Sequence, residues 1–273
     1  MRLKEFFPIS SECDPLKPLH RPPASQQIYK STIPSRYHGF AVEQYFASRF
    51  TYQTREAWTA QILNGDILLN GSKAEPGCIL YEGDSIITHA GMRQEPPADC
   101  RLQVIYQDRH IRVFNKPAPI PVHPSGRYFQ NSMTEVLREM FPGEVPRPVH
   151  RLDATTTGLI VFALSRQAAG FILKEFKGHR IQKEYLALVK GKPEKKQFTL
   201  TAPIGVVAGA KRGVGEGILK PQAASTRVEW LASTDTHSIL KVTPLSGRTN
   251  QIRVHLSSQG LPILNDEVYG EGG

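Results

Sequence analysis

An arginine and an aspartate stand two residues apart at Arg151-Leu152-Asp153, shortly before the apolar run 159–164. Threonines occupy 155–157, between Asp153 and this apolar run, so the carboxylate is expected in a loop that leads into a β-strand. A carboxylate presented in this way can act as a nucleophile or as a general base. An ordinary Arg–Asp ion pair at a loop-to-strand boundary is the simpler alternative for this segment taken alone.

Three further motifs in the same region of the chain weaken that simpler alternative. With the segment around Asp153 they cover roughly residues 105 to 270, and they follow one another in a fixed order. In this order they resemble the signature of the RluA-type pseudouridine synthases, a match that no single motif would support. The three are Asn115-Lys116-Pro117 with His123-Pro124, Lys183-Glu184-Tyr185, and Gly247-Arg248-Thr249-Asn250-Gln251-Ile252-Arg253-Val254-His255 with Pro262-Ile263-Leu264-Asn265-Asp266.

The resemblance implies a catalytic role for three residues. Asp153 matches the family's catalytic aspartate, Arg253 the arginine that pairs with it, and Tyr185 the residue that stacks on the target uracil. If 251–254 is an alternating strand, Arg253 and Gln251 share one of its faces. The alternatives are a surface arginine and an ordinary half-buried tyrosine of a strand.

Other residues of the same motifs are assigned to the substrate. We expect Arg151 to project toward RNA, where it fills the gap left by an extruded base or, more simply, contacts a phosphate. The remaining expected substrate contacts are Asn115, Lys116, His123, Arg248 and Gln251.

The sequence departs from the family pattern at three places. Asn250 stands where many relatives have His, and Thr157 replaces a common Ser, but each keeps a hydrogen-bonding group. Relatives usually continue past the segment 263–270 with further sheet and core elements, whereas this chain ends at Gly273. The catalytic domain is therefore expected to be short, either because the gene product is short or because the chain is a fragment.

Pseudouridine formation, the reaction that the resemblance implies, breaks the bond from ribose to the uracil nitrogen and remakes it to carbon five. It requires an ionised carboxylate within reach of a flipped-out nucleotide, and a neighbouring cation favours the ionised form. The sequence holds no ordered metal-ligand cluster, no nucleotide-binding fingerprint and no motif around a nucleophilic cysteine. We therefore expect neither a metal nor a cofactor.

The composition agrees with an RNA partner. The 34 Lys and Arg residues exceed the 25 Asp and Glu residues, which gives a formal net charge of +9 and favours a polyanion. Three cysteines, widely spaced and without a Cys-x-x-Cys pair, favour a reducing compartment. The chain has neither an apolar stretch of membrane-spanning length nor a secretory signal, so we expect a cytoplasmic location without membrane contact, with an organelle as the alternative. We also expect a monomer.

The first third of the chain is expected to hold a small RNA-binding domain. Residues 1–33 are interpreted as an extended arm, 34–88 as this small domain and 89–99 as a linker. Two short helices and a hairpin in 34–88 resemble the alpha-L RNA-binding domain shared with a ribosomal protein. Phe46 and Trp58 are assigned to its core. The expected phosphate contacts are Arg36, Arg49, Arg55 and Lys73.

Residues 100–273 are expected to form the catalytic domain, with an α+β fold of a mixed, largely antiparallel sheet and flanking helices. The helices are predicted at 133–140, capped by Ser132 or Asn131, and at 167–177, ending at Gly178. The glycine-rich stretch 205–217 is interpreted as a flexible basic loop. Strands are predicted at 102–106, 111–114, 185–189, 225–231 and 238–242.

Two functions remain open on these observations. The first is an isomerase that converts uridine to pseudouridine in ribosomal or transfer RNA. The second is a catalytically inactive RNA-binding or RNA-chaperone protein on the same fold. The joint presence of Asp153, Tyr185 and Arg253 favours the isomerase, because a binding protein has no need of an acid beside an anionic substrate. A deaminase is not indicated, since the His-x-Glu and Pro-Cys-x-x-Cys motifs are missing.

Overall fold

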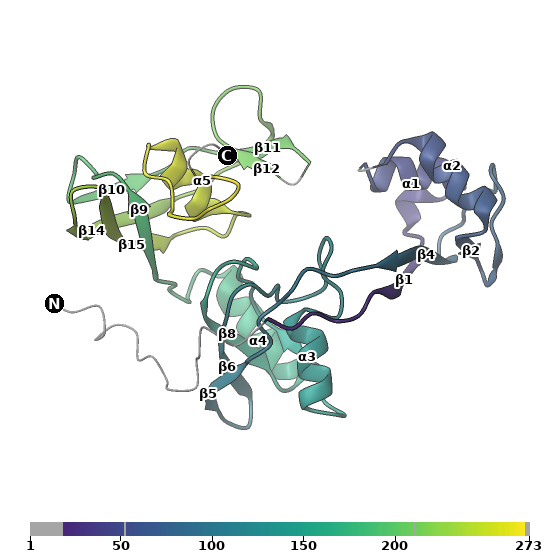
Figure 1. Cartoon of the computed structure of the whole chain (residues 1–273), viewed down its shortest axis with the longest axis horizontal. Coiled ribbons are helices and arrows are strands. Elements are labelled where there is room, and N and C mark those ends of the chain that lie inside the picture. The colour runs from purple at the N-terminus through teal and green to yellow at the C-terminus, as the bar shows by residue number, and fades with distance from the viewer. Residues whose placement is uncertain (1–18, 52, 210, 271–273) are drawn as a thin grey trace. The chain divides into compact units, whose positions relative to one another are not determined.

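The computed structural model describes residues 19–51, 53–209 and 211–270 (Figure 1). The chain divides into two compact units. The first unit comprises Met1–Tyr29 and Thr88–Leu173, and the second comprises Lys30–Ile87 and Lys174–Gly273. The sheets are antiparallel and the helices few, which confirms the predicted α+β class. In the described part of the chain, no helix has the length and apolar character needed to cross a membrane.

The first unit contains a four-stranded sheet that positions the candidate acid. The order is β5-β6-β8-β7, and the register pairs Lys116 at the end of β6 with Gly158 at the start of β8. Helix α3 packs on this sheet through Met133 and Leu137, which share a core with Phe114. The elements are β5 (Gln103–Gln107), β6 (Ile111–Lys116), α3 (Met133–Met140), β7 (Arg147–Pro148), β8 (Gly158–Ala163) and α4 (Arg166–Lys177), the last of which crosses the unit boundary.

The segment 30–87 of the second unit contains the predicted pair of helices. Phe46 and Trp58 are each 2% exposed, which confirms their assignment to the core. Gly65, with a φ of 81°, ends the second helix, and Asn70-Gly71 forms the predicted tight turn with both φ angles positive. The elements are η2 (Ser35–Tyr37), α1 (Val42–Arg49), α2 (Arg55–Asn64), β2 (Ile67–Leu69) and β3 (Ser72–Lys73), with the sheet order β1-β4-β2-β3.

The segment 174–273 contains a second four-stranded sheet, in the order β10-β14-β15-β9, with helix α5 packed on one face. Leu256 of α5 joins Val228 and Leu240 of the strands in one core. A separate three-stranded sheet has the order β12-β11-β13. The elements are β9 (Tyr185–Lys190), β10 (Gln197–Leu200), β11 (Ile204–Ala208), β12 (Lys211–Gly213), β13 (Leu219–Gln222), β14 (Thr226–Ser233), β15 (His237–Pro244) and α5 (Gln251–Ser258).

The structure differs from the sequence-based expectations at four places. The expected arm and linker overlap the strands β1 (Ser25–Thr32) and β4 (Ser85–Arg93), which are neighbours in one sheet; residues 1–18 of the arm lie outside the described residues. The stretch 205–217, interpreted as a loop throughout, contains most of β11 and all of β12. Ser132 occupies the N-cap position of α3, but its hydroxyl donates to Phe129 O and makes no cap bond, and the Asn131 amide donates to His20 O and Pro96 O instead. The fourth difference concerns Arg253 itself.

Arg253 lies on a helix, and the prediction of an alternating strand at 251–254 is wrong. The apolar residues at 252, 254 and 256 suggested a period of two. The face of α5 that is buried, however, runs through Gln251, Val254 and His255, at helical spacing. Two of these three, Gln251 and His255, are polar and are buried with hydrogen bonds. The pattern of apolar residues alone therefore does not show the helical period.

Candidate active site

One buried lysine, Lys116, binds the backbone of the loop that carries Asp153. The Lys116 side chain is 0% exposed, and its ammonium donates to three backbone carbonyls, those of Pro117 (2.9 Å), Ala154 (3.0 Å) and Thr156 (2.7 Å). The loop also closes on itself, because Thr156 N donates to Asp153 O at 3.0 Å. The backbone around Asp153 is therefore fixed by a charged donor that saturates all three of its N–H bonds.

This position contradicts the expectation that Lys116 binds substrate. Burial lowers the pKa of the Lys116 ammonium to about 8, and the opposite charge of Asp153 counteracts part of that fall. The Lys116 ammonium is thus a positive charge close enough to interact with Asp153, whose side chain is half-buried. The buried Lys116 ammonium thus contacts the loop backbone and lies near the Asp153 charge, and it has no N–H left for a molecule in the pocket.

Asp153 lines a pocket of about 260 Å³, close to the lower end of the range of roughly 300–1,000 Å³ for small-ligand sites. Two exposed arginines, Arg127 and Arg151, and the ring of His123 line it as well. Burial, and next the charge of Arg151, lower the pKa of His123 below its usual value, which favours the neutral imidazole. The remaining lining residues are Pro121, Val122, Ser125, Gly126, Tyr128, Leu152 and Ala154.

Arg127 is a pocket residue that the sequence motifs missed. It follows His123-Pro124 by three residues, in Ser125-Gly126-Arg127, and lies outside every motif used to find the site. An anion that enters the pocket would meet two guanidinium groups, and guanidinium groups suit phosphate geometry. The only signal for Arg127 in the sequence is that it lies close to His123 along the chain.

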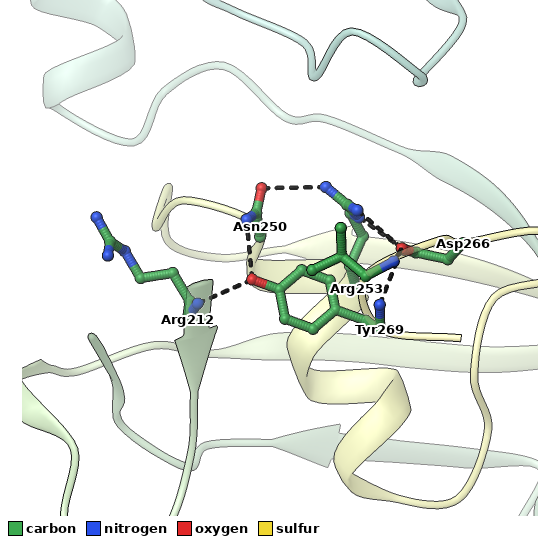
Figure 2. Close-up of polar contacts among 6 residues, drawn as sticks. Arg212, Asn250, Arg253, Asp266 and Tyr269 are labelled. Atoms are coloured by element: carbon green, nitrogen blue, oxygen red, sulfur yellow. Dashed lines mark hydrogen bonds and ion pairs between the residues drawn. The ribbon is translucent and has the colours of Figure 1, made fainter. Parts of the chain in front are cut away.

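Arg253 lies in the second unit, where a carboxylate fixes its guanidinium (Figure 2). Its Nε and Nη2 donate to the two oxygens of Asp266 at 2.7 and 2.8 Å, and its Nη1 donates to Asn250 Oδ1 at 3.3 Å. The Tyr269 ring lies under the guanidinium carbon at 4.9 Å. Asn250, the residue that departs from the family pattern, therefore keeps a hydrogen bond to the predicted catalytic arginine.

Asp266 is charged because its hydrogen bonds outweigh its burial. Burial by itself raises the pKa of Asp266, but the Arg253 guanidinium and the backbone N–H groups of Tyr269 and Val268 bring it below the usual value. Asp266 lies in the motif 262–266, and the motif alone predicts no role for it. Its contacts make it the residue that orients Arg253 within this unit.

We expect Asp266→Asn to lower the free energy of unfolding by about 3 kcal/mol at pH 7, because it removes one charge of a pair whose carboxylate is only 5% exposed. Since the pKa of Asp266 is depressed, its contribution is complete above the unfolded-state value of about 3.9 and is lost as the pH falls through the folded-state value. Urea unfolding at pH 7 and pH 2.5 should show a large and then a small difference from the wild type.

The matched control for this prediction is Glu184→Gln, which breaks the exposed pair with Lys241. Its effect should stay below about 1 kcal/mol at either pH. An Asp266→Asn loss of equal size at both pH values would contradict an electrostatic role for the carboxylate.

The other predicted site residues occupy different settings. Tyr185 begins β9 and packs half-buried against the core of its sheet, and Asn115 is exposed on β6. Gln251 is 4% exposed, and its side-chain amide accepts from Arg248 N and donates to Ser225 O. A direct substrate contact is therefore contradicted for it. Arg248 is exposed, with Nε donating to Ala223 O at 2.9 Å. The trio of Asp153, Tyr185 and Arg253 spans both units, and its assembly into one centre stays a prediction.

The four basic residues expected to contact RNA in the segment 30–87 are not equally available. Arg55 pairs with Glu43, so its charge is already compensated. Lys73 is exposed on β3. The contacts that the arginines make are Arg36 over the Tyr37 ring at 4.9 Å, Arg49 Nη1 to Tyr45 Oη at 2.7 Å, and Arg55 Nη2 to Glu43 Oε1 at 2.9 Å.

A family model described as RNA pseudouridylate synthase matches residues 110–258 of this chain. That range begins just before β6 and ends with α5, so it contains the Asp153 loop, Tyr185 and Arg253. The range covers more than half of the chain.

Individual relatives agree with this match. A mitochondrial tRNA pseudouridine(32) synthase of Saccharomyces cerevisiae is 35% identical over 88% of this chain, and the chain spans 53% of that relative, about half its length. The ribosomal large subunit pseudouridine synthase D of Pseudomonas aeruginosa is 30% identical over 87% of this chain and 76% of the relative. The solved structure of human RNA pseudouridylate synthase domain containing 1 superposes with a TM-score of 0.56 at 31% identity, covering 65% of this chain and 73% of that one.

Proposed function

Because the chain belongs to the RNA pseudouridylate synthase family, we propose that it isomerises uridine to pseudouridine in structured RNA, with Asp153 as the catalytic residue. One observation carries the proposal: Asp153 lines a pocket, on a loop that the buried Lys116 ammonium holds by two of its carbonyls, those of Ala154 and Thr156. In a protein that only binds RNA, a carboxylate in the pocket would repel the anionic ligand. A catalytic role explains why this chain has one there.

The reaction itself needs no redox partner or energy source. The bond from C1′ of the ribose to N1 of uracil breaks, the ring turns, and a bond from C1′ to C5 forms. The proton on C5 is then lost to solvent and N1 gains a proton, so atoms and electrons balance. Asp153 would act on the sugar as a nucleophile or as a base, which requires its ionised form.

The remaining pocket residues would receive the flipped-out nucleotide. Arg151 and Arg127 supply positive charge for its phosphates at the pocket rim. Within the proposal, Tyr185 stacks on the uracil ring and Arg253 pairs with Asp153, the roles that the family resemblance implies. The neutral form of His123 keeps a hydrogen-bond acceptor in the pocket.

Transfer RNA and large-subunit ribosomal RNA are the two proposed substrates, since the names of the yeast and Pseudomonas relatives refer to one each. The purified chain should be incubated with unmodified transcripts of both, and pseudouridine should be located by carbodiimide labelling and primer extension. A labelled stop at a defined uridine in either RNA supports the proposal. RNA binding without any labelled stop would favour the alternative of an inactive RNA-binding protein.

A cytoplasmic location and a monomeric state are part of the proposal.

We further propose that the segment 30–87 is an accessory RNA-binding part that contacts phosphates through Arg36, Arg49 and Lys73. Joint replacement of these three by Gln should weaken RNA affinity and flatten its salt dependence by roughly 0.7 to 0.9 of log–log slope per lost contact. Turnover at saturating RNA should not change. Arg55→Gln is the control, because Glu43 already neutralises that charge. An unchanged slope in the triple variant would assign this part to the fold or to a protein partner.

A further inference from the structure

The loop 245–250, between β15 and α5, is held rigid by one buried amide. Gln251, which is 4% exposed, accepts from Ser246 Oγ at 2.7 Å and from Arg248 N at 2.9 Å. Its amide nitrogen donates to Ser225 O and to Thr226 Oγ1, both at 2.9 Å. The loop is thus fixed at both ends by a side chain that has no remaining freedom, so whatever it binds meets a preformed surface.

Lys183 lies beside this loop without an anionic partner. Its ammonium is 3.9 Å from the point where a Cβ on Gly247 would stand. Among the described residues, Lys183 makes no hydrogen bond and no ion pair. Burial lowers the pKa of its ammonium below the usual value, so the charged form lacks the compensation that a partner would give.

Arg212, on β12, is tied to the other end of the loop through a tyrosine. Its backbone N–H donates to Tyr269 Oη at 2.9 Å, and the Asn250 amide donates to the same oxygen at 3.0 Å. Figure 2 shows the Arg212 side chain extending away from Tyr269, with Asn250 between the guanidinium groups of Arg212 and Arg253 in this view. The Nη1 atom of Arg212 is buried and has no hydrogen-bond partner in the described structure. A buried guanidinium N–H without an acceptor is costly, and it signals a missing partner.

Two acidic residues of this region already have cationic partners. Asp266 is engaged by two hydrogen bonds from Arg253, and Glu184 is paired with Lys241 at 2.7 Å. Arg248 contacts only a neutral carbonyl among its recorded partners. Lys183 thus lies beside the loop, Arg248 lies on it, and the backbone of Arg212 is joined to it through Tyr269. None of the three side chains has a carboxylate partner among the described residues.

We propose that Lys183, Arg212 and Arg248 bind the phosphodiester backbone of the RNA substrate on the loop 245–250. The proposal rests on the proposed function, which supplies the polyanion. A phosphate oxygen would accept from the guanidinium of the half-buried Arg212 and would neutralise the Lys183 ammonium. These residues bind the backbone and do not touch the reacting atoms, so their loss should affect RNA affinity and leave the chemical step intact.

The test uses the full chain and an unmodified tRNA transcript, with affinity measured at several salt concentrations. Lys183→Gln and Arg212→Gln should each weaken binding about 5- to 20-fold and reduce the log–log salt slope by roughly 0.7 to 0.9. The rate at saturating RNA should stay within about twofold of the wild type. Lys195→Gln removes an equal charge from an exposed position beyond the opposite end of β9, and it should leave the slope almost unchanged.

The outcomes separate this proposal from the proposed function. Wild-type slopes in both Lys183→Gln and Arg212→Gln overturn the phosphate site, whether or not the chain isomerises uridine. Reduced slopes in a chain that never forms pseudouridine support the site and overturn the function. If Arg212→Gln unfolds, Lys183→Gln decides alone, because the Lys183 side chain makes no hydrogen bond or ion pair among the described residues that its loss could break. A wild-type chain that fails to bind RNA overturns both.

Discussion

Replacement of Asp153 by asparagine is expected to abolish pseudouridine formation while RNA affinity stays nearly unchanged. The change is isosteric and removes only the charge, so the pocket and the loop contacts of Lys116 with backbone carbonyls persist. Loss of a nucleophile or base in the chemical step should lower the single-turnover rate by more than about 1,000-fold, roughly 4 kcal/mol in barrier. Rate and affinity should be measured on the same RNA.

Asp235→Asn is the matched control, because this aspartate is fully exposed on the turn between β14 and β15. It should leave both rate and affinity unchanged. An Asp153→Asn rate within about tenfold of the wild type would remove Asp153 from the chemistry and leave the pocket without an acid.

Replacement of Lys116 by methionine is expected to destabilise the first unit and to disrupt the reaction. The buried ammonium donates to three carbonyls, and methionine fills a similar volume but leaves the acceptors without their donor. We expect a loss of about 3 to 5 kcal/mol in the free energy of unfolding. Even in the folded fraction, a displaced Asp153 loop should lower turnover by about 100-fold, with little change in RNA affinity.

Chemical unfolding gives the first quantity, and single-turnover kinetics below the unfolding transition gives the second. Lys195→Met provides the control on an exposed lysine and should change neither. A Lys116→Met protein of wild-type stability and rate would show that the three hydrogen bonds are dispensable and that the loop is fixed by other contacts.

Local sequence patterns were sufficient where an element buries apolar residues at one clear period. The helix at 133–140 was predicted with the bounds that the structure has, and the strand at 185–189 differs from β9 by a single residue. Patterns failed where polar residues are buried, as in α5, or where strands are short and glycine-rich, as in β11 and β12. In those segments the structure depends on contacts with residues that are distant in sequence, and a local pattern of apolar residues cannot predict such contacts.

The same distinction applies to the site. Asp153 could be found from a motif, because its chemistry depends on residue type and near neighbours. The role of Lys116 could not, since it depends on the pairing of β6 with β8, which brings its ammonium to carbonyls 38 and 40 residues away. The pairing of Arg253 with Asp266 likewise arises only when the segment after α5 folds back on the helix.

The most direct test of the central claim is the release of tritium from RNA labelled at carbon five of uridine. Isomerisation must break the C5–H bond of each uridine converted, so tritium should appear in water in step with pseudouridine. We predict release with the wild-type chain on unmodified tRNA or ribosomal RNA transcripts, and none above background with Asp153→Asn. Equal release by both proteins, or no release by the wild type from an RNA that it binds, would contradict the account.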